Sequence, residues 1–208
     1  MKLRDQLVRD QKLRWIDIGC GGNFEDGFDY LDIFAEDIVE PHLRLRYHRV
    51  DILNSDSAAF SELGVYDLVR LQHTLEHFSL EEARQVLINC AALLERGGVL
   101  LITVPDLRVH IEKYLSDGYK DWEGFKDWAL KRIPEDAPAS FFFSIFTHSM
   151  PYESHRWCYD APGLEFLLQK ATQYEGIREL KFTDPEASQP FTHNRPEEDL
   201  CFVAKRIG

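Results

Sequence analysis

The chain has 208 residues, of which 44% are hydrophobic, and this length suits one domain with a full core better than two. Its formal net charge of −12 disfavours a nucleic-acid partner, because counterion release from a polyanion requires an excess of Lys and Arg. No apolar run approaches the length of a secretory or membrane-spanning segment, so we expect a cytoplasmic protein without membrane contact.

An apolar strand that ends in an acid and enters a glycine turn is the most informative segment. Residues 15–23 read WIDIGCGGN. Gly19, Gly21 and Gly22 can adopt positive φ and leave room for a ligand against the main chain. A dinucleotide fingerprint needs a third glycine where Phe24 stands, and no G-K-[ST] follows, so a nicotinamide site and a Walker A loop are both disfavoured. Taken alone, the turn also fits an ordinary bend after a buried strand.

Further strands follow at short intervals along the first half of the chain. They are expected near residues 13–18, 28–33, 46–52 and 66–71. The second begins so soon that residues 21–27 leave no room for the full helix that ordinarily joins such strands. Ser79 and Glu82 form a capping box, and the apolar residues after them recur in steps of three and four, which predicts a helix that ends at Gly97.

The second half contains a buried strand, an insertion and a closing hairpin. The apolar run at 99–104 is typical of a strand covered on both faces of a parallel sheet. Residues 107–150 resemble an insertion, with helices expected near 107–116 and 122–133 and an aromatic stretch at 141–146. Asp160 is expected to cap a helix that continues to about Tyr174, and strands at 177–182 and 200–206 are expected to close the sheet.

Four motifs in this order resemble the class I S-adenosylmethionine-dependent methyltransferases. They are D-x-G-C-G-G-N at 17–23, L-E-H-F at 75–78, L-E-R-G-G followed by V-P-D at 94–106, and H-R-W-C-Y-D at 155–160. The narrower resemblance is to a bacterial group of predicted methyltransferases with undefined substrates. It implies an α/β fold in one domain over residues 1–208, with a Rossmann-like sheet that is mostly parallel and has an antiparallel C-terminal hairpin strand. It also implies that 107–150 form a substrate lid.

The resemblance places a cofactor, S-adenosylmethionine, beyond the carboxyl ends of the strands. Asp17 and the glycine turn would meet its methionine portion, Asp32 its ribose hydroxyls and Asp51 its adenine. Acids are also common at strand ends as turn and helix caps, and Glu36 or Asp37 is an alternative to Asp32. The implied cofactor contacts are Asp17, Gly19, Cys20, Gly21, Asp32, Ile33, Asp51, Ile52, Gln72 and His73.

A second group of polar residues follows the fourth strand. If a helical turn begins at Gln72, then His73, Glu76 and His77 share one face at the spacing of metal ligands. The pattern H-x-x-E-H is similar to the E-x-x-E-H of some metal-dependent O-methyltransferases, which would allow a divalent cation. The favoured interpretation is that no metal binds, because L-E-H also occurs in methyltransferases that need none and there makes local hydrogen bonds.

Methyl transfer needs alignment and at most one base, for which His73, Asp106 and His155 are the candidates. A helix cap for Asp106 and a structural hydrogen bond for His155 are equally compatible with the sequence. The predicted function is methylation, at oxygen, of a small-molecule or glycan-linked acceptor. The alternative is a non-catalytic protein that binds S-adenosylmethionine and interacts with a partner. The aromatic stretch at 141–146 would form a lid over the acceptor, a homodimer surface or the core of a helical subdomain.

Overall fold

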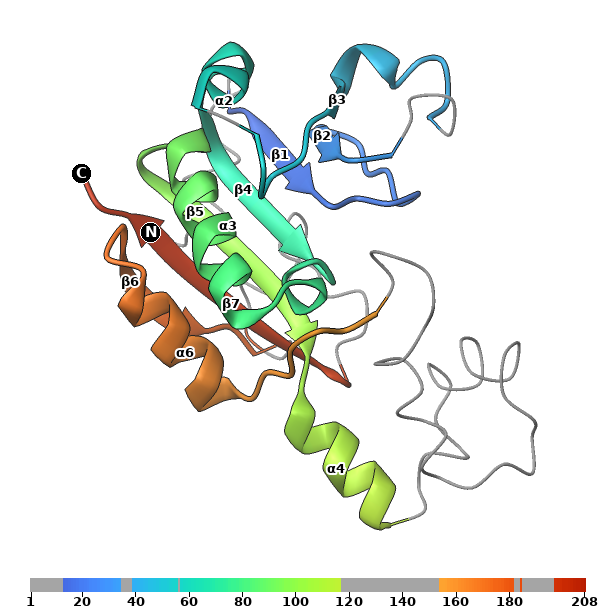
Figure 1. The fold of residues 1–208 in the computed structure, drawn as a ribbon, viewed down its shortest axis with the longest axis vertical. Coiled ribbons are helices and arrows are strands. Elements are labelled where there is room, and N and C mark those ends of the chain that lie inside the picture. The colour runs from blue at the N-terminus through green and yellow to red at the C-terminus, as the bar shows by residue number, and fades with distance from the viewer. Residues whose placement is uncertain (1–12, 35–38, 56, 117–153, 182–183, 185–196) are drawn as a thin grey trace.

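A seven-stranded sheet forms the centre of the computed structural model, which describes residues 13–34, 39–55, 57–116, 154–181, 184 and 197–208 (Figure 1). The strand order is β3-β2-β1-β4-β5-β7-β6. The first five strands pair in parallel, and β7 is antiparallel to both β5 and β6, which confirms the predicted sheet. The strands are β1 (Trp15–Ile18), β2 (Phe28–Asp32), β3 (Tyr47–Arg49), β4 (Tyr66–Gln72), β5 (Leu94–Pro105), β6 (Tyr174–Glu179) and β7 (Asp199–Arg206).

Helices α3 and α6 cover one face of this sheet, whereas α4 extends away from the end of β5 (Figure 1). No helix joins β1 to β2, as the short spacing predicted. None of the helices in the described segments combines the length and apolar character needed to cross a bilayer. The helices are α2 (Ser57–Leu63), α3 (Leu80–Leu93), α4 (Leu107–Leu115) and α6 (Ala161–Lys170), with single 3-10 turns η2 (Arg44–Arg46) and η3 (Leu75–His77).

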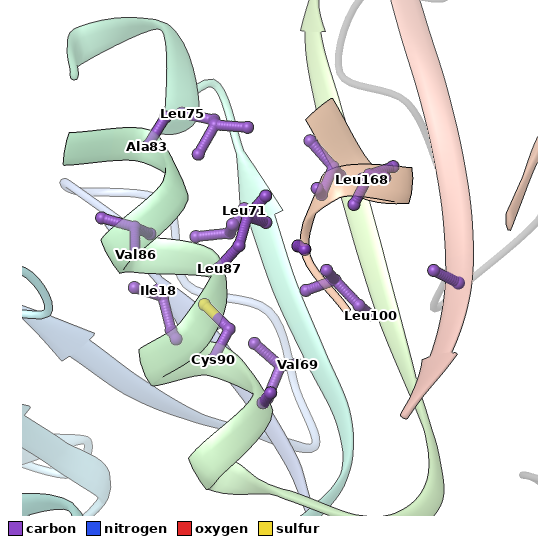
Figure 2. Packing of buried hydrophobic residues seen from close by; sticks show 14 of the residues in the cluster. Ile18, Val69, Leu71, Leu75, Ala83, Val86, Leu87, Cys90, Leu100 and Leu168 are labelled. Carbon is purple, nitrogen blue, oxygen red and sulfur yellow. The ribbon is translucent and has the colours of Figure 1, made fainter. Parts of the chain in front are cut away.

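The core between α3 and the sheet follows directly from the periodicity of the helix. Ala83, Val86, Leu87 and Cys90 are fully buried and lie against side chains of β1 and β4 (Figure 2). The capping box is present, because Ser79 Oγ accepts from the Glu82 amide and Glu82 accepts from the Ser79 amide. The apolar run in β5 is buried on both of its faces. This packing fixes β4, and with it the residues that follow its carboxyl end.

Several predicted boundaries in the described residues are wrong: α3 ends at Leu93 rather than at Gly97, and β5 begins at Leu94 rather than near Val99. β3 is shorter than expected, and the helix after Asp160 ends at Lys170 rather than near Tyr174. Tyr174 instead begins β6, where its hydroxyl donates to the Leu87 carbonyl at 2.6 Å. The buried residues of α6 and Tyr174 share helical spacing, so periodicity alone could not separate them. The predicted helix at 122–133, the aromatic stretch and most of the proposed lid lie outside the described residues.

Candidate active site at the carboxyl edge of the sheet

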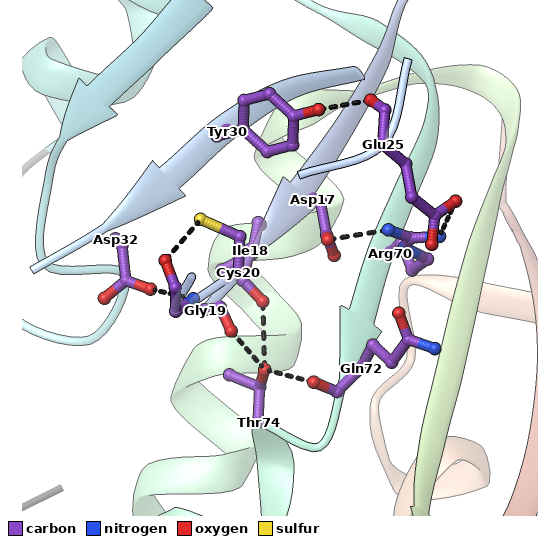
Figure 3. Close-up of polar contacts among 11 residues, drawn as sticks. Asp17, Ile18, Gly19, Cys20, Glu25, Tyr30, Asp32, Arg70, Gln72 and Thr74 are labelled. Atoms are coloured by element: carbon purple, nitrogen blue, oxygen red, sulfur yellow. Dashed lines mark hydrogen bonds and ion pairs between the residues drawn. The ribbon is translucent and has the colours of Figure 1, made fainter. Parts of the chain in front are cut away.

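The glycine turn is anchored to two neighbouring strands (Figure 3). Gly19 has φ +72°, and its amide donates to the Leu31 carbonyl at 2.8 Å. A Cβ at Gly19 would lie 2.4 Å from Cγ2 of Thr74, so both the backbone angle and the packing require glycine there. Gly21 also has positive φ, at +55°, but a Cβ at Gly21 would meet no heavy atom within 4 Å among the described residues. The turn is therefore packed on one side and open on the other.

Asp32 connects the end of β2 to this turn (Figure 3). Its Oδ2 accepts from the Gly21 amide at 2.8 Å, and its Oδ1 accepts from the Ile33 amide at 2.7 Å. Each carboxylate oxygen has two lone pairs, so each can accept one further hydrogen bond. The structure thus brings together Asp32, Ile33 and the glycine turn, as the sequence-based site required.

Asp51 follows β3 and caps the turn that comes next. Its Oδ1 accepts from the amides of Leu53 and Asn54, at 2.9 and 3.1 Å, and its Oδ2 accepts from Asn54 Nδ2 at 2.8 Å. Ile52 is buried, and its carbonyl accepts from Asn89 of α3. The turn cap anticipated from the sequence is therefore present at Asp51, and it leaves one accepting position on Oδ2.

Asp17 lies in a buried ion pair that the sequence interpretation missed. Its Oδ2 is 2.7 Å from Nη2 of Arg70, which has no exposed surface and also contacts Glu25 at 3.1 Å (Figure 3). The guanidinium lies over the Phe28 ring at 4.2 Å. Among the described residues, Oδ1 of Asp17 accepts no hydrogen bond. An arginine inside the apolar strand at 66–71 was the available signal, because a buried guanidinium needs acidic partners.

The chain changes direction after β4, where Gln72 is buried and His73 adopts φ +51°. The His73 amide continues the pairing with β5 by donating to the Thr103 carbonyl at 3.0 Å. The helical turn expected from Gln72 is therefore wrong, because β4 continues through Gln72 and the first turn of helix is η3, which begins at Leu75. His73 consequently does not share a helical face with Glu76 and His77.

His73 lies between two carboxylates instead. Its Nε2 is 2.9 Å from Oδ2 of Asp199, the first residue of β7, and its Nδ1 is 3.3 Å from Oε1 of Glu76. Burial alone would lower the pKa of His73, but hydrogen bonding and charge from Asp199 and Glu76 outweigh burial and raise it to about 10. The ring is therefore an imidazolium at neutral pH. Asp199 was not anticipated from the sequence, because it is 126 residues away from His73.

His155 joins Glu76 and His77 on the other side of η3. The amides of Arg156 and Trp157 donate to the Glu76 carbonyl, at 2.8 and 3.2 Å, and hold this segment against η3. The rings of His77 and His155 are 5.0 Å apart at their centroids, and His155 Nε2 is 4.0 Å from Oε1 of Glu76. The possible metal ligands that the structure groups are therefore Glu76, His77 and His155, rather than the predicted set containing His73.

Asp106 caps α4 at the same edge of the sheet. Its Oδ1 accepts from the Arg108 amide at 2.9 Å, and its own amide donates to the Glu198 carbonyl at 2.8 Å. Asp106 also forms a bridge with Tyr159, so the segments around 106, 159 and 198 are adjacent. Burial raises the pKa of the Asp106 carboxyl above its ordinary value. The helix cap is thus present, and a partly buried carboxyl with one oxygen left for a ligand accompanies it.

Residues 1–172 match the family described as "Methyltransferase domain". The chain is a member of this methyltransferase family. Together with the strand order and the antiparallel β7, the match assigns it to the class I S-adenosylmethionine-dependent methyltransferases. The mRNA cap guanine-N(7) methyltransferase of Schizosaccharomyces pombe is 30% identical over an alignment of 156 positions, which covers 64% of this methyltransferase and 43% of that protein. This methyltransferase therefore spans less than half of that relative.

Two solved structures show the same fold at low sequence identity. An O-methyltransferase family protein from Burkholderia thailandensis has a TM-score of 0.53 and 18% identity, over 98% of this methyltransferase and 55% of that chain. An S-adenosylmethionine-dependent methyltransferase from Clostridium acetobutylicum has a TM-score of 0.55 and 14% identity, over 99% and 87% of the two chains. At these identities the likeness concerns the fold.

Proposed function

We propose that this methyltransferase binds S-adenosylmethionine over the glycine turn and methylates an oxygen of a small-molecule or glycan-linked acceptor. The open space above Gly21, next to an Asp32 carboxylate that still has accepting positions, is the observation that carries the proposal. The backbone of Gly19 to Gly21 would hold the methionine portion, with Asp17 Oδ1 available to its ammonium group. Asp32 would accept hydrogen bonds from the ribose hydroxyls, and Asp51 and Ile52 would face the adenine. The rest of the cofactor site would be lined by Cys20, Ile33, Gln72 and His73.

The bound cofactor supplies a methyl group that is already activated by the positive sulfur. The protein must align the acceptor oxygen in line with the sulfur–carbon bond and accept the proton that this oxygen loses. When the carbon–oxygen bond forms, the sulfur–carbon bond breaks and S-adenosylhomocysteine leaves without the sulfonium charge. The protein must therefore exclude water from the site and position one base.

Two of the three candidate bases suit the proton-accepting role. His73 does not, because carboxylates occupy both of its ring nitrogens and keep it protonated. We assign His73 the task of positioning Glu76 and β7. Asp106 retains an oxygen beyond its cap interaction and has a raised pKa, and His155 lies on the same edge of the sheet. Asp106→Asn and His155→Asn are expected to lower kcat while leaving affinity for S-adenosylhomocysteine within about threefold, a difference of less than 1 kcal/mol.

Calorimetric titration tests the cofactor half of the proposal. S-adenosylmethionine and S-adenosylhomocysteine should each bind one per chain, whereas NAD should not bind. Asp32→Asn should weaken both adenosyl ligands, because it removes a charged acceptor next to the turn. The control is Asp26→Asn, which removes an exposed acid from the loop between the same two strands. Failure of both adenosyl ligands to bind the wild-type protein would disprove the proposal.

A second acceptor class is supported by the relative from Schizosaccharomyces pombe, an mRNA cap guanine-N(7) methyltransferase. Methylation of a ring nitrogen in a guanosine nucleotide needs the same donor and the same in-line alignment. The net charge of −12 disfavours a long nucleic acid and leaves a mononucleotide or dinucleotide as the form to test. A screen with methyl-labelled cofactor should therefore include sugars, glycolipid precursors and guanosine nucleotides. Cofactor binding without transfer to any of them would favour the non-catalytic alternative.

A further inference from the structure

Three side chains from two separate segments meet beside the carboxyl end of β4. Glu76 and His77 belong to η3, and His155 belongs to the segment that donates its next two amides to the Glu76 carbonyl. One carboxylate oxygen and one nitrogen from each ring all lie within 4.8 Å of one another. We call Glu76, His77 and His155 the η3 cluster.

The carboxylate of this cluster is buried and has few polar neighbours. Glu76 is 1% exposed and its Oε1 lies 3.3 Å from His73 Nδ1, but neither oxygen accepts a well-aligned hydrogen bond from any residue that the structure describes. A buried carboxylate in its charged form needs compensation by donors or cations. Among the described residues the nearest cation is His73, which is also paired with Asp199.

The His77 ring has the orientation that metal-binding imidazoles usually have. His77 Nδ1 donates to the Ser154 carbonyl at 3.3 Å, so in the neutral ring the lone pair is on Nε2. A backbone carbonyl that accepts from the other nitrogen is the common means of fixing a metal-binding tautomer. On the carboxylate, His73 Nδ1 lies 3.3 Å from Glu76 Oε1, and His73 Nε2 in turn lies 2.9 Å from Asp199 Oδ2. The cluster therefore has three possible metal-ligand atoms, and neighbouring groups orient Glu76 and His77.

From this geometry we infer that the η3 cluster binds one divalent first-row transition-metal cation, with zinc as the reference ion. Two imidazoles and one carboxylate suit zinc, iron or manganese better than magnesium, which prefers an all-oxygen shell. Ligand atoms lie about 2.0–2.2 Å from bound zinc, so the three side chains must close toward one another by small rotations. Positions not filled by the protein would remain for water or an acceptor oxygen.

Cation binding changes the assignment of roles at this edge of the sheet. The lone pair of His155 would be occupied by the metal, so Asp106 would become the proton acceptor in the proposed methyl transfer. Binding itself is measured without a methyl donor. Absence of metal binding therefore leaves the proposed methyl transfer untouched, and absence of methyl transfer leaves the metal result untouched.

The direct test is calorimetry on the full chain after treatment with EDTA. Zinc should bind with a stoichiometry of one ion per chain. Manganese should bind with lower affinity than zinc, and magnesium should show no measurable binding. His77→Asn and His155→Asn should each weaken zinc binding by about 100-fold or more, since even outer-sphere changes cost 10–100-fold. The control is His42→Asn, which removes an exposed imidazole that also contacts a glutamate, Glu40, and should leave affinity unchanged.

Cobalt substitution identifies the ligands independently of the variants. Bound Co²⁺ should give the weak visible bands of a nitrogen and oxygen site and no intense thiolate band from the exposed Cys158. Zinc should also raise the free energy of unfolding of the wild-type protein, measured with denaturant. This measurement does not depend on whether the variants fold. Three results would overturn the site: no zinc binding to the wild type, equal binding by both cluster variants, or a thiolate band that Cys158→Ser abolishes.

Discussion

Gly19 and Gly21 have similar backbone angles but different surroundings, and this difference makes them informative residues. At Gly19 the neighbouring Thr74 fills the space a side chain would need, and Thr74 also donates to the Ile18 carbonyl at 3.0 Å. At Gly21 the space is open. Packing therefore determines the first glycine, whereas the second leaves the surface that we assign to the cofactor.

We predict that Gly19→Ala and Gly21→Ala differ in how much stability they lose, and that Gly21→Ala loses cofactor binding through contact with the ligand. Gly21→Ala should lower the free energy of unfolding by about 1–2 kcal/mol, the cost of a left-handed alanine, and should abolish or strongly weaken S-adenosylhomocysteine binding. Gly19→Ala should cost a further ~1–3 kcal/mol, because the added methyl overlaps Thr74. Urea denaturation and calorimetry measure the two quantities. Equal stabilities, or normal binding by Gly21→Ala, would contradict this division.

Individual site residues could be predicted from the sequence, whereas the residues that contact them could not. Asp17, Asp32 and Asp106 were assigned to the correct strand ends, because an acid after an apolar strand is a local pattern. The ion pair between Asp17 and Arg70 joins residues 53 positions apart, which is beyond any local pattern. His73 was placed on a helical turn because its positive φ is rare for a residue other than glycine.

At the scale of elements, the start of helix α3 was fully predictable from the sequence. The Ser79 amide, by donating to Glu82, lowers the pKa of the Glu82 carboxyl below its ordinary value, and contact with Arg156 adds to this effect. Because the pKa of Glu82 is lower in the folded chain, its carboxylate contributes to stability at pH values above 4.5, the pKa in the unfolded chain. This contribution is lost as the pH falls through the lower folded-state pKa.

Variants of this cap should therefore differ in their pH dependence. Ser79→Ala should cost about 1 kcal/mol at neutral pH. Glu82→Gln should be less stable than the wild type at pH 7, and this difference should shrink at pH 3, because the Glu82 carboxylate becomes protonated as the pH falls below 4.5 toward the lower folded-state pKa. Glu81→Gln, one residue earlier and far more exposed, is the matched control and should show little difference at either pH. Urea denaturation at the two pH values measures these differences.

Element ends were predicted where a capping side chain marks them and missed where tertiary contacts decide. Asp160 and Ser79 accept from amides of their own helices, so sequence alone identified both starts. The end of α6 has no such mark, and Tyr174 leaves the helix to reach the Leu87 carbonyl in α3. The site residues around η3 have the same limitation, because segment 154–157 is positioned by the Glu76 carbonyl.

At the scale of the whole molecule, the order of the strands brings every proposed cofactor contact to one edge of the sheet. The alternation of strands and helices predicted this order, since class I methyltransferases share it, and the crossover without a helix was visible in the spacing. The identity of the acceptor does not follow from the fold, because the two solved methyltransferase structures share this fold at only 18% and 14% sequence identity.

Cofactor binding at this edge should stabilise the entire fold. S-adenosylhomocysteine at 100 times its Kd should raise the free energy of unfolding by about 2.7 kcal/mol, because it binds only the folded chain. The same concentration should stabilise Asp32→Asn less, and NAD should stabilise neither. Urea denaturation with and without ligand measures the change. An equal gain for wild type and Asp32→Asn would place the ligand away from Asp32.

The reversed direction of β7 has a consequence for synthesis. Because β7 is antiparallel to β5, it begins where β5 ends, with Asp199 opposite Pro105. A ribosome releases β4, η3 and the His155 segment well before Asp199. Until then, the nascent chain can form the ends of the parallel strands, but His73 lacks the carboxylate that helps to keep it charged. Asp199 therefore completes this edge of the sheet late in synthesis, and a chain interrupted before Asp199 would lack both a finished site and β7, the strand through which β6 joins the sheet.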